Sequence, residues 1–451
     1  MKDGMNVNRR GFLKGSALGM LGTMAVPTII TGCTSTGEGK LKDVAVPELL
    51  PKAPEGRPLK AGLIGCGGRG LGAVSDFMKA GDGLQITVIG DVLADKVEAG
   101  RQTLREMGIE LAAENCFSGF DAYKKVIDSD VDIVLHCSPP TFRPSQFAYA
   151  IEQGKHCFIE KPCGVDPVGV RSIIQTSKIA ASKRLSVISG TIRRSQKNCW
   201  EAYRRVAGGA IGDIVTAHVT RMGNASWLRP RKPGWSDMEY MIRNWINFSW
   251  IAGDLLLEQF IHEIDQMNWF LGDIRPQRAE ATGGRHRRTT GDMYDFFSVE
   301  YVYDDNRMRT HCTSRQMMGC DNLNQVLVYG TKGYTNCFDT IWNLDGTVAW
   351  KYPYAEGETT QGHQADAFVQ EHIRLITSIR RNEPVNDAEI HAQSVMIAMM
   401  GRMAAYTGKF VTFDEVLTSQ LKLGPDTYEF GPVPDMTEQH PVPGVPTPPL
   451  E

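Results

Sequence analysis

The sequence predicts an α/β protein that begins with a doubly wound parallel sheet. Three observations lead to this prediction. An apolar strand candidate runs directly into a glycine-rich turn, further apolar strands alternate with helical segments, and two of these strands end in proline-containing turns. In sheets of this type ligands bind at the carboxyl ends of the strands, so we expect a functional site at that edge.

The first turn has the pattern G-x-G-x-x-G, which is GCGGRG at 65–70. It follows the apolar run 59–64 and precedes a helical pattern over 71–80. In a dinucleotide-binding turn the first glycine makes the bend, the second admits the pyrophosphate and the third lets the helix pack on the strand. The helix N-terminus adds amide donors for phosphate. The residues expected to hold the cofactor here are Gly65, Gly67, Gly68, Arg69 and Gly70.

The second strand candidate, 84–90, ends in Asp91, which lies 21 residues after Gly70. This is the spacing of a carboxylate that binds a ribose diol. No Lys or Arg follows until Lys96, so a 2′-phosphate would meet an unrelieved negative charge. The pattern therefore favours NAD over NADP, and the other interpretation of Asp91 is a simple cap at a strand end.

The alternation continues through helical stretches at 120–129 and 142–152 and strand candidates at 131–137 and 155–159. A parallel sheet brings the ends of these strands to one edge. The residues that follow them, and that we also expect to hold the cofactor, are Ser138, Pro139, Glu160 and Lys161.

The N-terminus has the layout of an export signal. Arg9 and Arg10 precede an apolar run of about 15 residues, short for a membrane span of about 20. The paired arginines resemble a twin-arginine signal, which implies a periplasmic or membrane-anchored protein. Ile30 to Cys33 resembles a loose lipobox, and lipidation of Cys33 and cleavage without lipid both stay open. A lipid on Cys33 is the one membrane contact we expect.

The composition of the chain disfavours several classes of partner and site. The net charge is −3, with 42% apolar and 22% charged residues and no basic run, so we expect no nucleic-acid partner. The ten cysteines form no C-x-x-C pair, which argues against a zinc ribbon or a disulfide framework. Most of them lie in apolar runs and are interpreted as small buried side chains.

These motifs resemble the Gfo/Idh/MocA family of oxidoreductases over residues of about 60–430. The matching segments are GCGGRG, Asp91, the SPP turn, GKHCFIEKP and LLEQFIHEIDQMNW. The resemblance implies a C-terminal α+β domain built on an open, largely antiparallel sheet that often forms a subunit interface, and hence a homo-oligomer. Runs that suit this domain are strands at 214–221, 296–303, 308–314 and 324–329 and helices at 365–381 and 388–408.

The resemblance also implies site residues. The family's catalytic lysine falls on Lys161 and its catalytic histidine on His262, while Glu258 replaces an aspartate by a longer acid. Asp265 matches the trailing acid, and Arg143 stands where relatives commonly have histidine. The spacing of 258, 262 and 265 would place all three side chains on one helix face.

Hydride transfer requires a base for the hydroxyl proton. We assign His262 as the leading base, Lys161 as orienter or co-base and Glu258 as orienter; the roles of His262 and Lys161 could be exchanged. A buried core histidine is the alternative for His262, and we expect no metal at this cluster.

The segment 227–250 is dense in Trp, Arg and Asn, which suits carbohydrate or a loop pinned by buried tryptophans. The side chains expected to bind substrate are Arg193, Arg243, Trp245 and Asp265. The sequence thus favours an NAD-dependent dehydrogenase of a sugar, glycoside or cyclitol. An NAD-recycling glycosidase that works by oxidation, elimination and reduction is the alternative, and a non-catalytic sugar-binding lipoprotein is an alternative of another class. The expected segments are a signal at 1–33, a linker at 34–58, an NAD-binding domain at 59–189, a substrate and oligomerisation domain at 190–435 and a tail at 436–451.

Overall fold

The computed structural model describes residues 47–433. The expected signal at 1–33 with Cys33, the linker up to residue 46 and the tail at 436–451 lie outside the described residues. Within 47–433, no helix has the length and apolar character required to cross a membrane.

The first sheet is parallel and doubly wound, as the sequence predicts. Its strands are β1 (Leu59–Ile64), β2 (Leu84–Asp91), β3 (Cys116–Ser118), β4 (Ile133–His136), β5 (His156–Ile159) and β6 (Val187–Ser189). They pair in the order β3-β2-β1-β4-β5-β6. The strand order reverses between β1 and β4, so the crevice for a ligand opens at the ends of these two strands.

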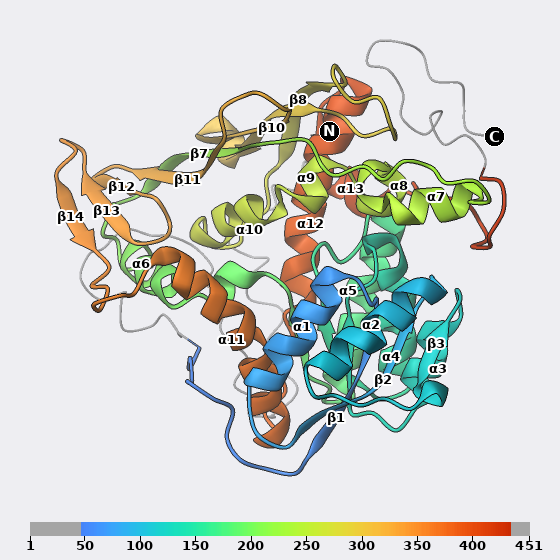
Figure 1. Ribbon diagram of the computed structural model, residues 1–451. Coiled ribbons are helices and arrows are strands. Elements are labelled where there is room, and N and C mark those ends of the chain that lie inside the picture. Colours follow the sequence, from blue (N-terminus) through green and yellow to red (C-terminus); the bar gives the residue numbers. More distant parts are fainter. Residues whose placement is uncertain (1–46, 434–451) are drawn as a thin grey trace, which may run out of the picture. The chain divides into compact units, whose positions relative to one another are not determined.

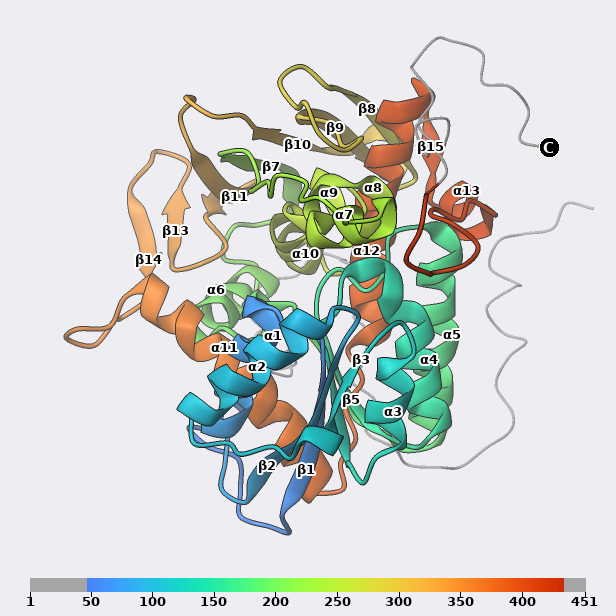
Figure 2. The ribbon, with the colours of Figure 1, turned by 45° about the vertical axis from the view of Figure 1, so that its right-hand side comes forward.

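Helices cover both faces of this sheet (Figures 1 and 2). The helices that follow its strands are α1 (Gly68–Lys79), α2 (Ala94–Glu106), α3 (Ala122–Asp128), α4 (Arg143–Glu152) and α5 (Pro167–Ser182). One face is completed by α11 (Thr360–Arg380), whose Ile373 and Ile376 join the apolar core around Phe77 of α1. The chain thus returns to its first sheet long after leaving it, which the sequence did not predict.

The second sheet is open and largely antiparallel. Its strands are β7 (Ile214–Gly223), β8 (Arg278–Gly284), β9 (Phe296–Tyr303), β10 (Met308–Gln316), β11 (Leu323–Gly330), β12 (Gly333–Thr335), β13 (Thr340–Asn343), β14 (Val348–Lys351) and β15 (Val411–Thr412). Their order is β14-β13-β12-β11-β7-β10-β9-β8-β15, and among the described strands of this second sheet only β7 and β10 pair in parallel. The expected runs at 214–221, 296–303, 308–314 and 324–329 are β7, β9, β10 and β11.

Helices between the two sheets carry the second core. They include α6 (Lys197–Ala207), α10 (Ile261–Phe270) and α12 (Ala388–Thr407), and shorter helices are α7 (Asp237–Arg243), α8 (Ser249–Ala252), α9 (Leu255–Glu258) and α13 (Phe413–Thr418). In Figure 2, α10 and α12 lie on the side of the second sheet that faces the first domain. Gly401 lets α12 approach β9, because a Cβ there would lie 2.9 Å from the Tyr301 hydroxyl oxygen. Helix α10 packs against α12 and carries His262, which lines the cavity at the edge of the first sheet.

Candidate active site

A cavity of about 560 Å³ lies at the carboxyl edge of the first sheet. The first domain contributes the glycine turn and the loops that follow β2, β4 and β5, and the second contributes residues around Trp227 and Arg243 together with Glu258 and His262. Residues expected to bind cofactor and residues expected to perform chemistry therefore share one cavity.

The glycine turn has the geometry of a phosphate cradle. Gly65 has a φ of +99°, and a Cβ there would lie 2.6 Å from the Cys137 carbonyl carbon, so only glycine fits. Gly67 and Gly68 have no atom within 4 Å of where a Cβ would stand, which leaves the turn open to a ligand. No side chain caps the N-terminus of α1, so its amides are available to phosphate. This turn fits a dinucleotide.

Asp91 ends β2 at the same edge. Its two carboxylate oxygens accept from the backbone N–H of Cys66 at 2.8 Å and of Leu93 at 2.9 Å. Burial raises its pKa, although these bonds and Lys96 oppose the shift. Asp91 thus caps the strand end and also lines the cavity. Lys96 also lines the cavity, although we expected it to lie too far along the chain to offset the charge of Asp91.

Arg69 ties the glycine turn to the segment after β5. Its guanidinium forms an ion pair with Glu160, lies 3.1 Å from an Asp76 oxygen and stacks over Phe368 at 4.7 Å. Burial disfavours the charge of Glu160, but Arg69 and Arg143 outweigh it and hold the pKa of Glu160 below its ordinary value. Ser138, after β4, donates to Gln146 at 2.6 Å and lines the cavity beside Pro139.

Lys161 is held by the second domain. Its Nζ donates to the backbone carbonyl of Glu258 at 2.6 Å and to the Glu258 carboxylate at 3.1 Å. The other carboxylate oxygen accepts from the Gln259 side chain. Arg143 is buried, lines the same cavity and donates to the Pro162 carbonyl at 2.6 Å. The amine is therefore oriented by contacts that leave it on the cavity wall.

His262 lines the cavity, and its ring forms no hydrogen bond with another residue of 47–433. Its pKa lies well below the ordinary value, first because the ring is buried and then because Lys161, Arg193 and Arg221 carry positive charge nearby. The imidazole is accordingly neutral at physiological pH, with a nitrogen free to accept a proton.

The expected single helix face of Glu258, His262 and Asp265 is wrong. Helix α9 ends at Glu258 and α10 begins at Ile261, so a break at 259–260 separates the acid from the histidine. Asp254, with a φ of +76°, caps the start of α9 through the Leu255 N–H. Glu258 and His262 still line the same cavity, whereas Asp265 does not.

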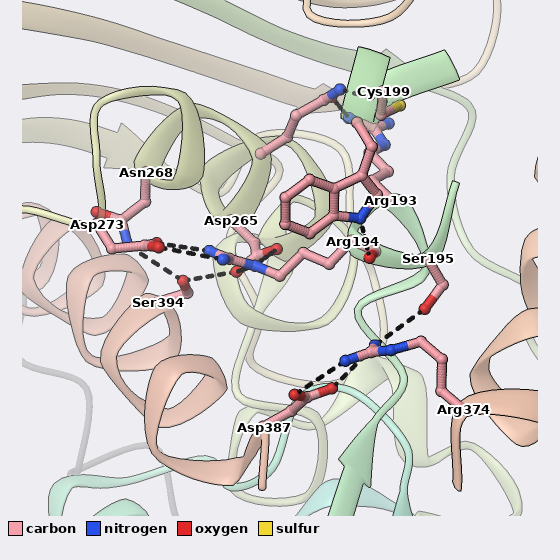
Figure 3. A network of polar contacts seen from close by, with 12 residues as sticks. Arg193, Arg194, Ser195, Cys199, Asp265, Asn268, Asp273, Arg374, Asp387 and Ser394 are labelled. Atoms are coloured by element: carbon pink, nitrogen blue, oxygen red, sulfur yellow. Dashed lines mark hydrogen bonds and ion pairs between the residues drawn. The ribbon is translucent and has the colours of Figure 1, made fainter. Parts of the chain in front are cut away.

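Arg193 and Asp265 hold the second domain together and do not line the cavity, contrary to the prediction that they bind substrate. Arg193 donates to Glu263 at 2.6 Å and to Gln266 at 2.5 Å. Asp265 accepts from Arg194 at 2.9 Å, and Arg194 also reaches Asp273 at 2.6 Å (Figure 3). Buried arginines of this kind are satisfied by internal carboxylates, which leaves none of their charge for a ligand.

The tryptophan-rich segment holds both buried and cavity-lining tryptophans. Trp250 is fully buried, whereas Trp227 and Trp245 line the cavity. Arg243 lines it as well, but its guanidinium also bonds both Asp95 oxygens, at 2.8 and 2.9 Å. Arg243 therefore closes the cleft as well as facing it. Among the described residues, no group of three or more His, Cys, Asp or Glu side chains could hold a metal ion.

A dinucleotide cradle that opens onto a lysine, an acid and a histidine defines an oxidoreductase of the nicotinamide-dependent class. Two sequence models of one family match the chain: an oxidoreductase-family NAD-binding Rossmann domain over residues 59–189 and the GFO/IDH/MocA C-terminal domain over 200–336. Together they cover more than half of the chain, which belongs to the GFO/IDH/MocA family of NAD-binding oxidoreductases.

The curated relatives include glycosyl hydrolase family 109 proteins and inositol 2-dehydrogenases. The chain is 32% identical over 150 residues to a glycosyl hydrolase family 109 protein of Porphyromonas gingivalis, covering 33% of this chain and 30% of that one. It is 26% identical over 216 residues to myo-inositol 2-dehydrogenase of Thermotoga maritima, covering 48% and 55%. The matched region thus spans well under two thirds of these relatives.

Solved structures share the fold. Scyllo-inositol dehydrogenase of Lactobacillus casei, in a structure with bound NAD(H) and scyllo-inositol, superposes with a TM-score of 0.59 at 21% identity. The superposition covers 79% of this chain and 99% of that chain.

Proposed function

We propose that this chain is an NAD-dependent enzyme that removes a hydride from a hydroxyl-bearing carbon of a sugar, glycoside or cyclitol. The observation that carries the proposal is the position of Lys161, Glu258 and His262 in the cavity that begins at the glycine turn. Inositol dehydrogenases among the relatives support a polyol or sugar as the substrate class.

The described residues can divide the work between binding and proton transfer. Gly67, Gly68 and the N-terminus of α1 would hold the diphosphate, and Asp91 the adenosine ribose, which favours NAD over NADP. When bound, the nicotinamide supplies the hydride acceptor. Lys161, aimed by Glu258, donates a hydrogen bond to the substrate oxygen as negative charge develops there. Neutral His262 accepts the hydroxyl proton.

A recycling glycosidase is the second candidate. In that reaction, oxidation of one ring hydroxyl acidifies the neighbouring C–H, loss of that proton expels the aglycone, water adds, and the hydride returns to the sugar. The net reaction is hydrolysis, so no nucleotide has to be exchanged. The family 109 glycosyl hydrolase relatives favour this candidate.

A covered cleft also favours it. Arg243 of α7 is bound to Asp95 at the start of α2, so the second domain reaches across to the nucleotide domain. Beside this contact, Tyr428 packs between Phe120 and Phe142, at 6.3 and 5.1 Å between ring centroids. We name α7 together with residues 421–433 the bridge. A dinucleotide beneath the bridge would leave slowly, which suits a resident cofactor.

The test uses protein that begins at residue 34, purified without added nucleotide. Denaturation should release NAD close to one per chain. The native protein is then incubated with a panel of glycosides and cyclitols while absorbance at 340 nm and product sugars are followed. Turnover without net NADH indicates recycling, and absorbance that rises with added NAD indicates the dehydrogenase. Protein that neither contains nor binds NAD would exclude both and leave a sugar-binding lipoprotein.

We also propose export by the twin-arginine route, on the evidence of Arg9 and Arg10. Replacing both by lysine should hold the full-length chain in the cytoplasm in cell fractionation, and labelling with palmitate should decide the state of Cys33. Export of the double variant would contradict the proposed route.

We propose a homo-oligomer because one face of the second sheet carries a row of stacked aromatic rings. Tyr334 lies 5.3 Å from Tyr329 and 5.0 Å from Trp342 between ring centroids, and all three rings are half-buried. Light scattering during gel filtration should give a mass above 50 kDa, and a monomer would contradict the proposal.

A further inference from the structure

The cations of the cavity differ in one respect, which is whether a carboxylate of the protein already neutralises them. The paired ones are Arg69 with Glu160, Lys161 with Glu258 and Arg243 with Asp95. Lys96 lies at the ribose end, where its charge acts on Asp91. Arg143 and Arg229 line the cavity and form no ion pair with any carboxylate of residues 47–433. Arg143 is buried and donates to the Pro162 carbonyl, whereas Arg229 is exposed to the cavity and to solvent.

Arg229 is nevertheless held in place. Its backbone N–H donates to the Asn244 side-chain oxygen at 2.7 Å, and the Asn244 amide donates back to the Arg229 carbonyl at 3.1 Å. Asn244 is fully buried, so this double contact anchors the loop to α7. The guanidinium stacks over the Trp227 ring at 4.5 Å and donates once to the Arg243 carbonyl, at 3.2 Å. Most of its donors stay free for a ligand.

Two tryptophans form the wall beside this guanidinium. Trp227 is 41% exposed, and its ring meets Trp245 edge to face at 6.4 Å between centroids. Both rings line the cavity. An aromatic face offers an apolar surface to the C–H groups of a sugar ring, and a planar guanidinium matches the two oxygens of a carboxylate. The wall therefore combines surfaces for a ring and for an anion.

We propose that the substrate is an anionic saccharide, with Arg229 as the residue that binds its carboxylate and the Trp227–Trp245 wall as the surface that receives its ring. The inference rests on the proposed hydride transfer, whose substrate class it narrows. The cofactor diphosphate is the other anion that could reach Arg229, but the glycine turn and the N-terminus of α1 already supply donors to it. The experiment separates these two sources.

The probes are matched pairs of 4-nitrophenyl glycosides, glucuronide with glucoside and galacturonide with galactoside, each as both anomers. The wild-type enzyme should have the higher kcat/KM for one uronide over its neutral partner. Arg229→Met should lower that kcat/KM by about 10- to 100-fold, mainly through KM, because a charge-assisted hydrogen bond is lost. Neutral glycosides should change by less than about 3-fold, since they do not use that bond.

Two further variants complete the set. Arg229→Lys keeps the positive charge but lacks the planar pair of N–H donors of a guanidinium, and it should recover part of the uronide preference. Arg231→Met removes a neighbouring exposed arginine that pairs with Asp237 and does not line the cavity, and it should leave the preference unchanged.

Binding of free glucuronate and glucose, measured by tryptophan fluorescence, gives a readout that does not depend on turnover. Preference for glucuronate in the wild type but not in Arg229→Met supports the anion site even if hydride transfer is never observed. Equal binding of both sugars by the wild type overturns it. Loss of bound NAD from Arg229→Met, with uronide and neutral substrate affected alike, also overturns it and assigns Arg229 to the cofactor. Absence of nicotinamide reduction and turnover with every sugar would instead count against the proposed function.

Discussion

The amine of Lys161 lies 2.6 Å from the backbone carbonyl of Glu258 and 3.1 Å from its carboxylate. One contact is to the main chain and the other to a side chain, so removal of the acid would leave the amine attached but less constrained. The two residues come from different domains, and Lys161 is thus positioned by the way the domains pack.

This geometry predicts that replacing Lys161 and replacing Glu258 lower kcat by different factors. Lys161→Met should lower kcat by about 10²- to 10⁴-fold, because the donor to the reacting oxygen is gone. Glu258→Gln should cost less, about 10-fold, because the carbonyl contact survives. Steady-state kinetics with a turned-over glycoside measures both. Bound NAD and the thermal midpoint serve as controls, and equal losses would show that the Glu258 charge has a larger part than orientation.

His262 predicts an unusual pH profile. Because burial and the neighbouring cations lower its pKa, the imidazole stays neutral well below pH 6.5. The fall of kcat/KM on the acid side should therefore not be centred near pH 6.5, where an ordinary histidine titrates. Profiles between pH 5 and 8 test this, with His262→Gln expected to lose about 10²- to 10⁴-fold. An acid limb near 6.5 that vanishes in the variant would contradict the assignment.

The bridge predicts slow release of the nucleotide. Asp95→Asn removes the charge opposite Arg243 outside the cavity lining, and Tyr428→Ala removes the ring between Phe120 and Phe142. Each should speed NAD dissociation, Asp95→Asn by about 2- to 5-fold because an exposed ion pair contributes little. Tyr428→Ala should have the larger effect.

Two truncations provide the matched control for the bridge. Ending the chain after residue 433 leaves every described contact of the bridge, whereas ending it after 420 removes Tyr428 and its neighbours. NAD release, followed by trapping with a second dehydrogenase, should accelerate in the shorter chain only. Equal rates in both would show that the bridge does not retain the cofactor.

The negative charge of Asp91 predicts a preference for NAD over NADP. Asp91→Asn removes the charge that repels a 2′-phosphate and keeps one carbonyl oxygen, which can accept from the Cys66 or the Leu93 N–H group but not from both. Lys96 would then act unopposed. The dissociation constant for NAD should rise about 10-fold while that for NADP falls, as measured by calorimetry on nucleotide-free protein. An unchanged ratio would mean that Asp91 acts only as a cap.

The sequence predicted the parts of the site that local rules govern. Gly65 must adopt a positive φ, and Asp91 and Glu160 directly follow strands, so their places follow from chain order and the parallel sheet. The helix break after Glu258 interrupts an apolar pattern that continues on both sides, so periodicity does not show it. The prediction that Arg193 and Asp265 bind substrate was wrong, because a sequence does not reveal which arginine a buried carboxylate has already neutralised. Lys96 was discounted by its distance along the chain, although it lines the cavity.

Buried histidines predict that the fold weakens in mild acid. His136, His372 and His391 are fully buried, and both ring nitrogens of each have no hydrogen-bond partner among the described residues. Burial, with nearby arginine charge, lowers the pKa of each to about 3. In the unfolded chain each titrates near 6.5, so the unfolded state binds more protons once the pH falls below that value. The stabilisation is present above pH 6.5 and is lost between 6.5 and about 3.

Each of these histidines should therefore lower the free energy of unfolding by about 1 kcal/mol between pH 7.5 and 5.5. His372 offers the clean test because its ring packs on Phe158 at 4.5 Å, so His372→Phe keeps an aromatic ring without a titrating group. Urea unfolding at the two pH values should show a smaller acid loss in this variant by about 1 kcal/mol. His286→Gln, at an exposed position, should leave the loss unchanged. The same acid loss in His372→Phe as in the wild type would mean that His372 takes up protons equally in the folded and the unfolded chain, and would contradict the prediction.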